Sequence, residues 1–200
     1  MLRPPQHDIE TEGRWIFPHD PSVDHERINH EKRVMESRQS EILERLALER
    51  EKDERDHEKI AALEAKADEQ EPTHHPWEVY QGGDTRYHLD ETVRSYAPGA
   101  TEFVLKRVSR ATWRVLSDQI AAFQAEKKPK QAAKLRREFA RSAIQAGVVR
   151  AENTELQLDY ITLKERDIDT LEELHGALPI TLAFAVFNYS RGLLASEKKR

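Results

Sequence analysis

The sequence contains no cysteine, only 7 glycines in 200 residues and no long apolar run. The absence of cysteine excludes disulfides, zinc–thiolate sites and thiol nucleophiles. The longest apolar segment, residues 177–187, is far shorter than the ~18 residues that a membrane-spanning helix needs. Residues 1–5 lack the apolar stretch of a signal peptide. We therefore expect an intracellular protein that makes no contact with a membrane.

Aromatic residues are missing from a long part of the chain. None occurs between Phe17 and Trp77, and 12 of the 14 lie from Trp77 onward. Residues 24–71 instead hold 16 acidic and 10 basic side chains, a net charge of −6. Hydrophobic residues make up 38% of the whole chain, below the ~45–50% of an average globular domain. A compact core is therefore expected in the last 124 residues and not in the first 76.

Residues 1–23 contain four prolines among polar residues. Proline blocks regular helix, and the segment has little to bury, so we predict an extended arm. Its apolar content is concentrated in Trp15, Ile16 and Phe17. Two roles are open for these three residues: they tether the arm to its own domain, or they anchor it on a partner. Because aromatic residues dominate interface energetics, all three are candidates for partner binding.

Residues 24–71 predict one long charged helix. Helix-favouring residues fill the segment without proline or glycine, Asp24 offers an N-cap, and Pro72 marks the end. The apolar stripe is too short for a sustained dimeric coiled coil, which needs roughly three or four heptads. The helix is either a solvated spacer or an element that docks a partner or a second copy. In the second case, contact is expected at Ile42, Leu43, Leu46 and Leu48.

Residues 72–200 predict a compact, mostly helical α+β domain. Short aromatic runs at 77–80 and 85–89 flank Gly82 and Gly83, which indicates a β-hairpin, and residues 103–105 predict a third strand. Helices are expected after Ser109, from Pro129, after residues 162–165 and over the apolar segment 177–187. The fold class is therefore mainly α: an extended arm, a long charged helix, and a small antiparallel sheet packed on about four helices.

The sequence offers no catalytic constellation. It lacks a phosphate-binding glycine loop, a nucleophile elbow and a His-Glu-x-x-His zinc helix. His74, His75 and His88 could approach one metal ion, but no acidic residue around them has a recognisable ligand spacing. We expect no enzyme, no cofactor and no metal site.

The strongest charge patch is basic and holds seven cations within 15 residues. Such a patch could contact nucleic acid phosphates or an acidic protein. The pI of about 6.0 lies well below the ~9 typical of nucleic-acid-binding domains, which argues against nucleic acid. The seven residues are Lys127, Lys128, Lys130, Lys134, Arg136, Arg137 and Arg141.

Residues 83–199 resemble the tail assembly chaperones of tailed bacteriophages and related small phage morphogenesis proteins. Three features carry the resemblance: a β segment that runs into a helix over residues 103–113, a helix that ends in Ala143-Ile144-Gln145-Ala146-Gly147-Val148, and a closing pattern. The closing pattern is Leu171-Glu172-Glu173-Leu174, an apolar helix, Asn188-Tyr189-Ser190-Arg191-Gly192-Leu193-Leu194 and the charged tail Glu197-Lys198-Lys199.

The resemblance implies a non-enzymatic, mainly helical protein of the host cytoplasm that binds the tape-measure and tail-tube proteins and is absent from the finished virion. Partner-binding candidates on the C-terminal domain are Phe184, Phe187 and Leu193. The first 76 residues depart from the family pattern. They leave open a structural virion protein of the head, neck or tail that binds neighbouring subunits. A nucleic-acid-binding adaptor that uses the basic patch is a third hypothesis. The long helix leaves two pairings open, with a second copy of the chain or with another protein.

Overall fold

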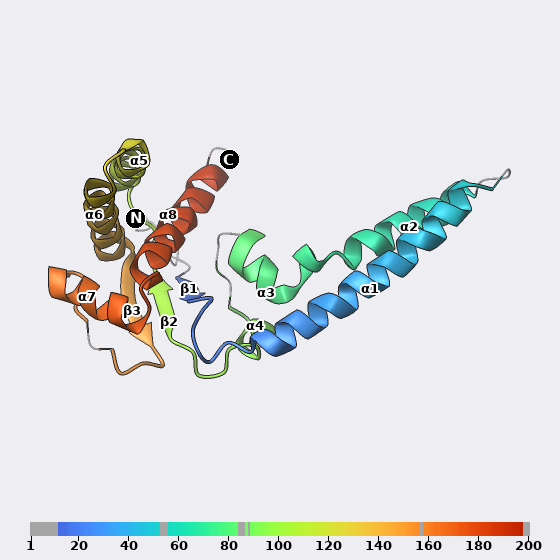
Figure 1. Cartoon of the computed structure of the whole chain (residues 1–200), viewed down its shortest axis with the longest axis horizontal. Coiled ribbons are helices and arrows are strands. Elements are labelled where there is room, and N and C mark those ends of the chain that lie inside the picture. Colours follow the sequence, from blue (N-terminus) through green and yellow to red (C-terminus); the bar gives the residue numbers. More distant parts are fainter. Residues whose placement is uncertain (1–11, 53–55, 84–86, 88, 157, 198–200) are drawn as a thin grey trace, which may run out of the picture. The chain divides into compact units, whose positions relative to one another are not determined.

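A computed structural model of the chain describes residues 12–52, 56–83, 87, 89–156 and 158–197 (Figure 1). This described part is mainly helical with a small antiparallel sheet, as predicted, and it contains eight α-helices and three strands. The described residues fall into two compact units. We call the first, bounded by Met1–Pro21, Asp84–Leu89 and Gly99–Arg200, the helix–sheet unit. We call the second, Ser22–Gly83 and Asp90–Pro98, the hairpin unit.

The sheet of the helix–sheet unit joins strands that lie far apart in the sequence. Strand β2 (Glu102–Leu105) is central and pairs with β1 (Gly13–Ile16) and β3 (Val148–Glu152). Strand β2 falls where the sequence predicted a strand. Strand β1 lies within residues 1–23, the predicted extended arm, and its extended backbone pairs with β2. On β1, Trp15 packs against Phe103 with ring centroids 5.8 Å apart, and burial of these rings draws the segment onto the sheet.

Charged side chains connect the three strands on the other face of the sheet. The Arg14 guanidinium donates to Glu102 at 2.9 Å and also pairs with Glu152. Arg150 donates to Glu152 at 2.8 Å. The Arg14 guanidinium, followed by that of Arg150, holds the pKa of the Glu152 carboxyl below its usual range. The network therefore joins β1 to β3 across β2.

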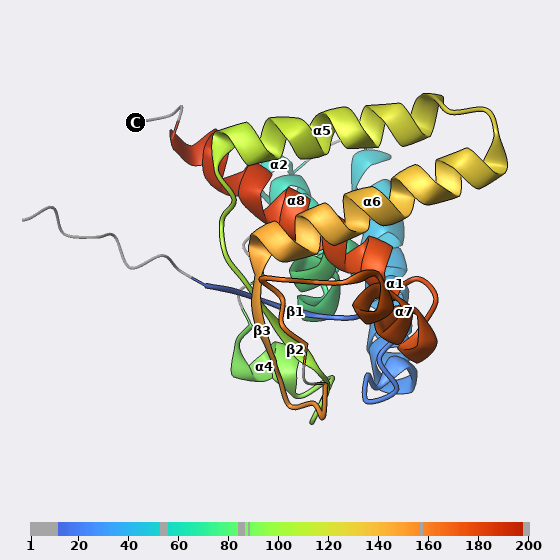
Figure 2. The ribbon, with the colours of Figure 1, turned by 90° about the vertical axis from the view of Figure 1, so that its left-hand side faces the viewer.

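Four helices make up the rest of this unit: α5 (Arg110–Ala125), α6 (Pro129–Gly147), α7 (Glu165–Leu174) and α8 (Leu178–Glu197). Figure 2 shows α5 and α6 side by side, with α8 packed beneath them. The predicted boundaries are confirmed where a local signal marked them. Ser109 caps α5 by accepting the Thr112 N–H at 3.1 Å, and α6 begins at Pro129 and ends at Gly147. Helix α8 supplies the centre of the core, with Leu182 and Val186 fully buried.

The hairpin unit replaces the predicted single helix over residues 24–71. Helix α1 (His25–Arg50) and helix α2 (His57–Glu69) lie side by side and antiparallel (Figure 1). The amide of Gln39 donates to the Ala67 carbonyl at 3.1 Å, near the base of the pair, and Arg50 pairs with Glu64 near its tip. The chain reverses inside residues 49–59, which contain no apolar side chain. One long helix would leave both weak apolar stripes in water, whereas the reversal packs them against each other.

The prediction of a β-hairpin over residues 77–89 is wrong for its first strand, residues 77–80, which the structure describes as helical turns. The chain forms a 3-10 turn η1 (Pro72–His74), a helical turn α3 (Pro76–Glu78), a π-helical turn η2 (Val79–Gly83) and α4 (Glu91–Arg94). Trp77 and Tyr80 are three residues apart and are both buried, which suits a helical turn better than an alternating strand. Residues 84–86 and 88 of the predicted second arm lie outside the described residues.

The division into units also differs from the predicted domain boundaries. Residues 72–83 and 90–98 pack with the charged helices rather than with the C-terminal helices. Asp24 does cap α1, because its carboxylate accepts the Arg27 N–H at 2.9 Å. The hairpin unit is thus inserted between β1 and β2 of the helix–sheet unit.

Candidate functional site

The three apolar residues of the predicted arm are core residues. Trp15, Ile16 and Phe17 are 2%, 0% and 4% exposed. The Phe17 ring also contacts the His175 ring, 4.8 Å away between centroids. Of the two roles left open by the sequence, the structure shows the tether. The prediction that these three residues bind a partner is wrong, because their side chains are buried and leave no surface for a partner to contact.

The predicted positions on α8 are half-buried and pack inside their own unit. Phe187 stacks on Trp113 at 4.9 Å with a 16° angle between ring planes, and Phe184 lies 5.3 Å from the Phe139 ring. We expected these two candidates for partner binding to be exposed. They are instead partly covered, because α5 and α6 pack against one side of α8. The side chain of Leu193 lies outside the described part of the chain.

The four predicted contact residues of the charged helix divide into two pairs. Leu46 is 5% exposed and Ile42 is half-buried, and both face α2. Leu43 is 47% exposed and Leu48 is 64% exposed. The inward pair forms the seam of the hairpin, so Leu43 and Leu48 are the two of the four that are exposed on its outer surface.

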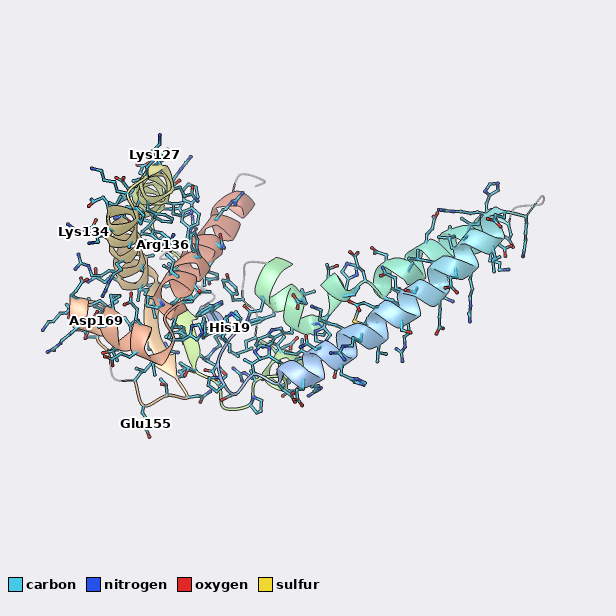
Figure 3. All side chains as sticks on the ribbon, in the orientation of Figure 1. His19, Lys127, Lys134, Arg136, Glu155 and Asp169 are labelled. Carbon is cyan, nitrogen blue, oxygen red and sulfur yellow. The ribbon has the colours of Figure 1, made fainter. Side chains whose placement is uncertain are left out.

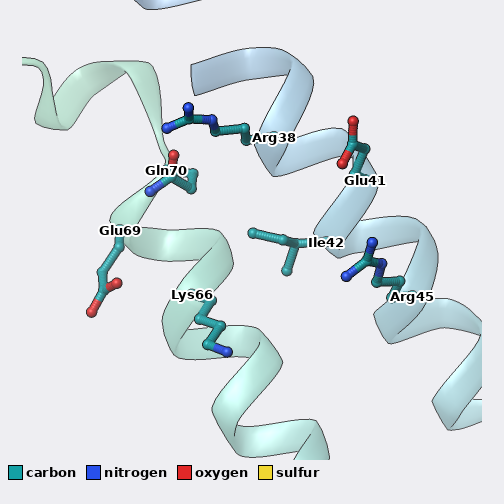
Figure 4. A pocket seen from close by; sticks show the side chains of 7 residues that line it. All are labelled: Arg38, Glu41, Ile42, Arg45, Lys66, Glu69 and Gln70. Atoms are coloured by element: carbon teal, nitrogen blue, oxygen red, sulfur yellow. The ribbon is translucent and has the colours of Figure 1, made fainter. Parts of the chain in front are cut away.

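A groove of about 330 Å³ lies between α1 and α2 near the inward pair. Figure 4 shows Ile42 extending from α1 toward α2, with Arg38 and Arg45 beside it and Lys66 opposite. Glu41, Glu69 and Gln70 complete the lining. The groove therefore combines an apolar floor with a charged rim of mixed sign.

The basic patch lies at the connection between α5 and α6 and along α6 (Figure 3). Its members are of two kinds. Lys127, Lys128, Lys130, Lys134 and Arg136 are exposed, whereas Arg137 and Arg141 are half-buried and form ion pairs with α7. The Arg136 guanidinium lies 5.7 Å from the centroid of the Phe123 ring, a cation–π distance. The sequence places these seven cations close together but does not reveal that α7 carboxylates pair with two of them, Arg137 and Arg141.

A polar cluster in the hairpin unit was not predicted. Glu31 on α1 accepts hydrogen bonds from the Tyr96 hydroxyl at 2.6 Å and from Arg27 at 2.8 Å. Its other partner is His75, whose Nε2 lies 3.1 Å away. The Tyr96 hydroxyl, followed by the Arg27 guanidinium, lowers the pKa of Glu31 to about 2. His75 and Tyr96 lie 44 and 65 positions after Glu31 in the sequence. No local sequence pattern predicts contacts between residues so far apart.

The same cluster defines the role of His75, which is 1% exposed. Its Nδ1 accepts the Trp77 backbone N–H at 3.2 Å, so its Nε2 carries the proton that is donated to Glu31. Both ring nitrogens are engaged in holding α3 against α1. A general base needs a nitrogen free to take a proton, so this geometry assigns His75 a structural role.

Within the described residues, one group of three side chains offers ligand atoms that lie within 4.8 Å of one another. These are Asp68, Glu71 and His74, on the surface at the end of α2. The Nδ1 of His74 lies 2.5 Å from the Asp68 carbonyl oxygen, which occupies one of the two ring nitrogens. His75 points elsewhere, and His88 lies outside the described residues, so the three histidines are not shown to converge.

In comparisons with known proteins, no family model, curated protein or solved structure matches the chain. Among the described residues, no helix is both long enough and apolar enough to cross a bilayer.

Proposed function

We propose that this chain is a non-enzymatic phage assembly protein that acts by binding other proteins, most specifically as a tail assembly chaperone. The resemblance of residues 83–199 to that family supports the assignment. Its partners are then the tape-measure protein and the tail-tube subunits. In this role the chain covers apolar surface on an aggregation-prone partner until assembly proceeds.

The observation that carries the proposal is the construction of the α1–α2 hairpin. Only four residues of these two fully described helices are buried: Ile28, Leu46, Glu49 and Ala67. An ordinary core-facing helix buries a stripe along its whole length. Ordering these 39 helical residues costs conformational entropy, and the four buried side chains recover little of it by burial. We therefore assign the exposed faces of the hairpin to contact with a partner.

The exposed leucines of α1 allow a direct test. The chain is co-expressed with the tape-measure protein of the phage that encodes it, and the soluble fraction of the tape-measure protein is measured. We expect Leu43→Ser with Leu48→Ser to lower that fraction without unfolding the chain, since both side chains are exposed. Val115→Ser is the matched control, because Val115 is 55% exposed but lies on α5.

Two results would contradict the proposal. The first is a tape-measure protein that is equally soluble with and without the chain. The second is an effect of the leucine substitutions no larger than that of Val115→Ser. Persistence of the chain at a fixed ratio in finished particles would instead favour the alternative role, a structural virion protein.

A further inference from the structure

Helix α6 carries a straight stripe of basic residues. Lys130, Lys134, Arg137 and Arg141 are spaced by four, three and four positions, which places them on one face of the helix. Lys127 and Lys128 precede the helix and extend the positive charge beyond its N-terminal end. We call the four helical residues the α6 stripe.

Helix α7 occupies the C-terminal half of the α6 stripe. Arg137 lies 2.5 Å from an Asp169 carboxylate oxygen and 3.4 Å from oxygens of Glu165 and Glu172. Arg141 lies 3.4 Å from Glu165. The three carboxylates are spaced by four and three positions, the same spacing as that of Lys130, Lys134 and Arg137. The chain therefore contains one example of an acidic helical stripe docked on this basic one.

The N-terminal half of the stripe is not covered in this way. Within the part of the chain that the structure describes, no carboxylate forms an ion pair with Lys130. The carboxylate of Glu138, on the same helix, lies 3.9 Å from the Lys134 ammonium, whose side chain is 69% exposed. Solvent screening makes such a pair weak. The positive charge of this half is thus left to solvent or to another molecule.

Helix α7 crosses α6 and does not run along it (Figure 2). Arg137 alone reaches Glu165, Asp169 and Glu172, which lie along the length of α7, while Arg141 reaches Glu165. The carboxylates of α7 are therefore gathered around Arg137 and Arg141, and none of them pairs with Lys130 or Lys134 in the part of the chain that the structure describes.

We propose that the free half of the α6 stripe binds an acidic helical segment of a partner protein, in the manner in which α7 occupies the other half. The partner presents carboxylates three or four positions apart on one helical face, the spacing that faces Arg137 and Arg141 within the chain. This inference goes beyond the proposed function, because it concerns the helix–sheet unit and holds whether or not the chain acts in tail assembly.

One observation favours a protein over nucleic acid as the occupant. Nucleic-acid sites commonly combine basic residues with exposed aromatic rings that stack on bases. Phe139, the aromatic residue between Arg137 and Arg141, is fully buried in the core.

A labelled peptide tests the proposal. The probe is a fluorescein-labelled alanine-based helical peptide of about five turns with glutamates at positions i, i+4 and i+7, and the control peptide carries glutamines there. Binding to the full chain is followed by fluorescence anisotropy at low salt. We expect the glutamate peptide to bind, the glutamine peptide to fail, and added salt to weaken the complex.

Matched charge reversals locate the site. Lys130→Glu with Lys134→Glu should weaken peptide binding at least about tenfold, because two favourable charge contacts become unfavourable. Arg110→Glu with Arg114→Glu makes the same change in net charge at the N-terminal end of α5 and should alter binding less than about twofold. Circular dichroism confirms that both variants are folded.

Three results would overturn the proposal. One is a failure of the glutamate peptide to bind the unaltered chain. Another is equal loss of binding in the two double variants, which would show a response to net charge and not to the stripe. The third is tighter binding of duplex DNA than of the peptide, lost on Lys130→Glu with Lys134→Glu, which would identify a nucleic acid as the ligand.

Discussion

Replacement of Gly147 by alanine should destabilise the helix–sheet unit. Gly147 is the last residue of α6, and a Cβ there would lie 2.1 Å from Cγ1 of Val186 on α8. Alanine is favoured over glycine in a helix by up to ~1 kcal/mol. Insertion of a methyl group into a packed core typically costs ~1–3 kcal/mol. Because Val186 is fully buried and is approached at such short range, we expect the steric cost to exceed the helical gain by about 1–2 kcal/mol.

A double-mutant cycle identifies the cause. Val186→Ala alone removes two buried methyl groups and should cost at least ~1.6 kcal/mol. In Gly147→Ala with Val186→Ala, the new methyl group enters the space that the valine leaves. The double variant should therefore be more stable than the sum of the single changes implies, by at least ~1 kcal/mol.

The assay is urea unfolding followed by circular dichroism, with peptide-resolved hydrogen exchange to attribute the loss to α6 and α8. Gly176→Ala is the matched control, because a Cβ at Gly176 would meet nothing within 4 Å. It should change the free energy of unfolding by no more than ~0.5 kcal/mol. A Gly147→Ala variant as stable as the unaltered chain, or strictly additive changes in the cycle, would refute the close approach of α6 and α8.

Three further outcomes are expected. Leu46→Ala should destabilise the hairpin by ~2 kcal/mol or more, whereas Leu48→Ala, at a position 64% exposed, should change the free energy of unfolding by less than ~0.5 kcal/mol; hydrogen exchange over α1 and α2 separates them. The pKa of Glu31 is lowered in the fold to about 2, so the hairpin unit should lose stability as the pH falls from near 4.5 toward 2. Glu31→Gln should flatten that loss in thermal melts. Arg137→Ala should weaken amide protection in α7, by ~1 kcal/mol at low salt and less at high salt.

Local signals predicted most of the C-terminal helices. Ser109 and Pro129 mark helix starts by physics that acts within one turn, and Gly147 marks a helix end. The strand at residues 102–105 was also evident from its own residues. Its partners were not, because β1 lies almost 90 positions earlier and pairing depends on which segments the fold brings together.

The failures have physical reasons in particular residues. The segment 49–59 contains neither glycine nor proline, so propensity alone continued one helix through it, although its lack of apolar side chains marks the point of reversal. Trp77 and Tyr80 fit a short strand or a helical turn equally well until burial on one side decides between them. Trp15, Ile16 and Phe17 form as good a core segment as a docking motif, since both require the same apolar surface.

The basic patch shows the same limit for a functional site. The sequence located all seven cations, because they are close together along the chain. The carboxylates that neutralise Arg137 and Arg141 come from α7, 24 to 35 positions later. Only the packed structure separates these two cations from the five exposed members of the patch.

The most direct test of the proposed role follows the chain through phage assembly. Quantitative mass spectrometry is applied to assembly intermediates that contain the tape-measure protein and to finished particles. A tail assembly chaperone is expected in the intermediates and absent from the particles. A fixed copy number of the chain in finished particles, or its absence from the intermediates, would contradict the account.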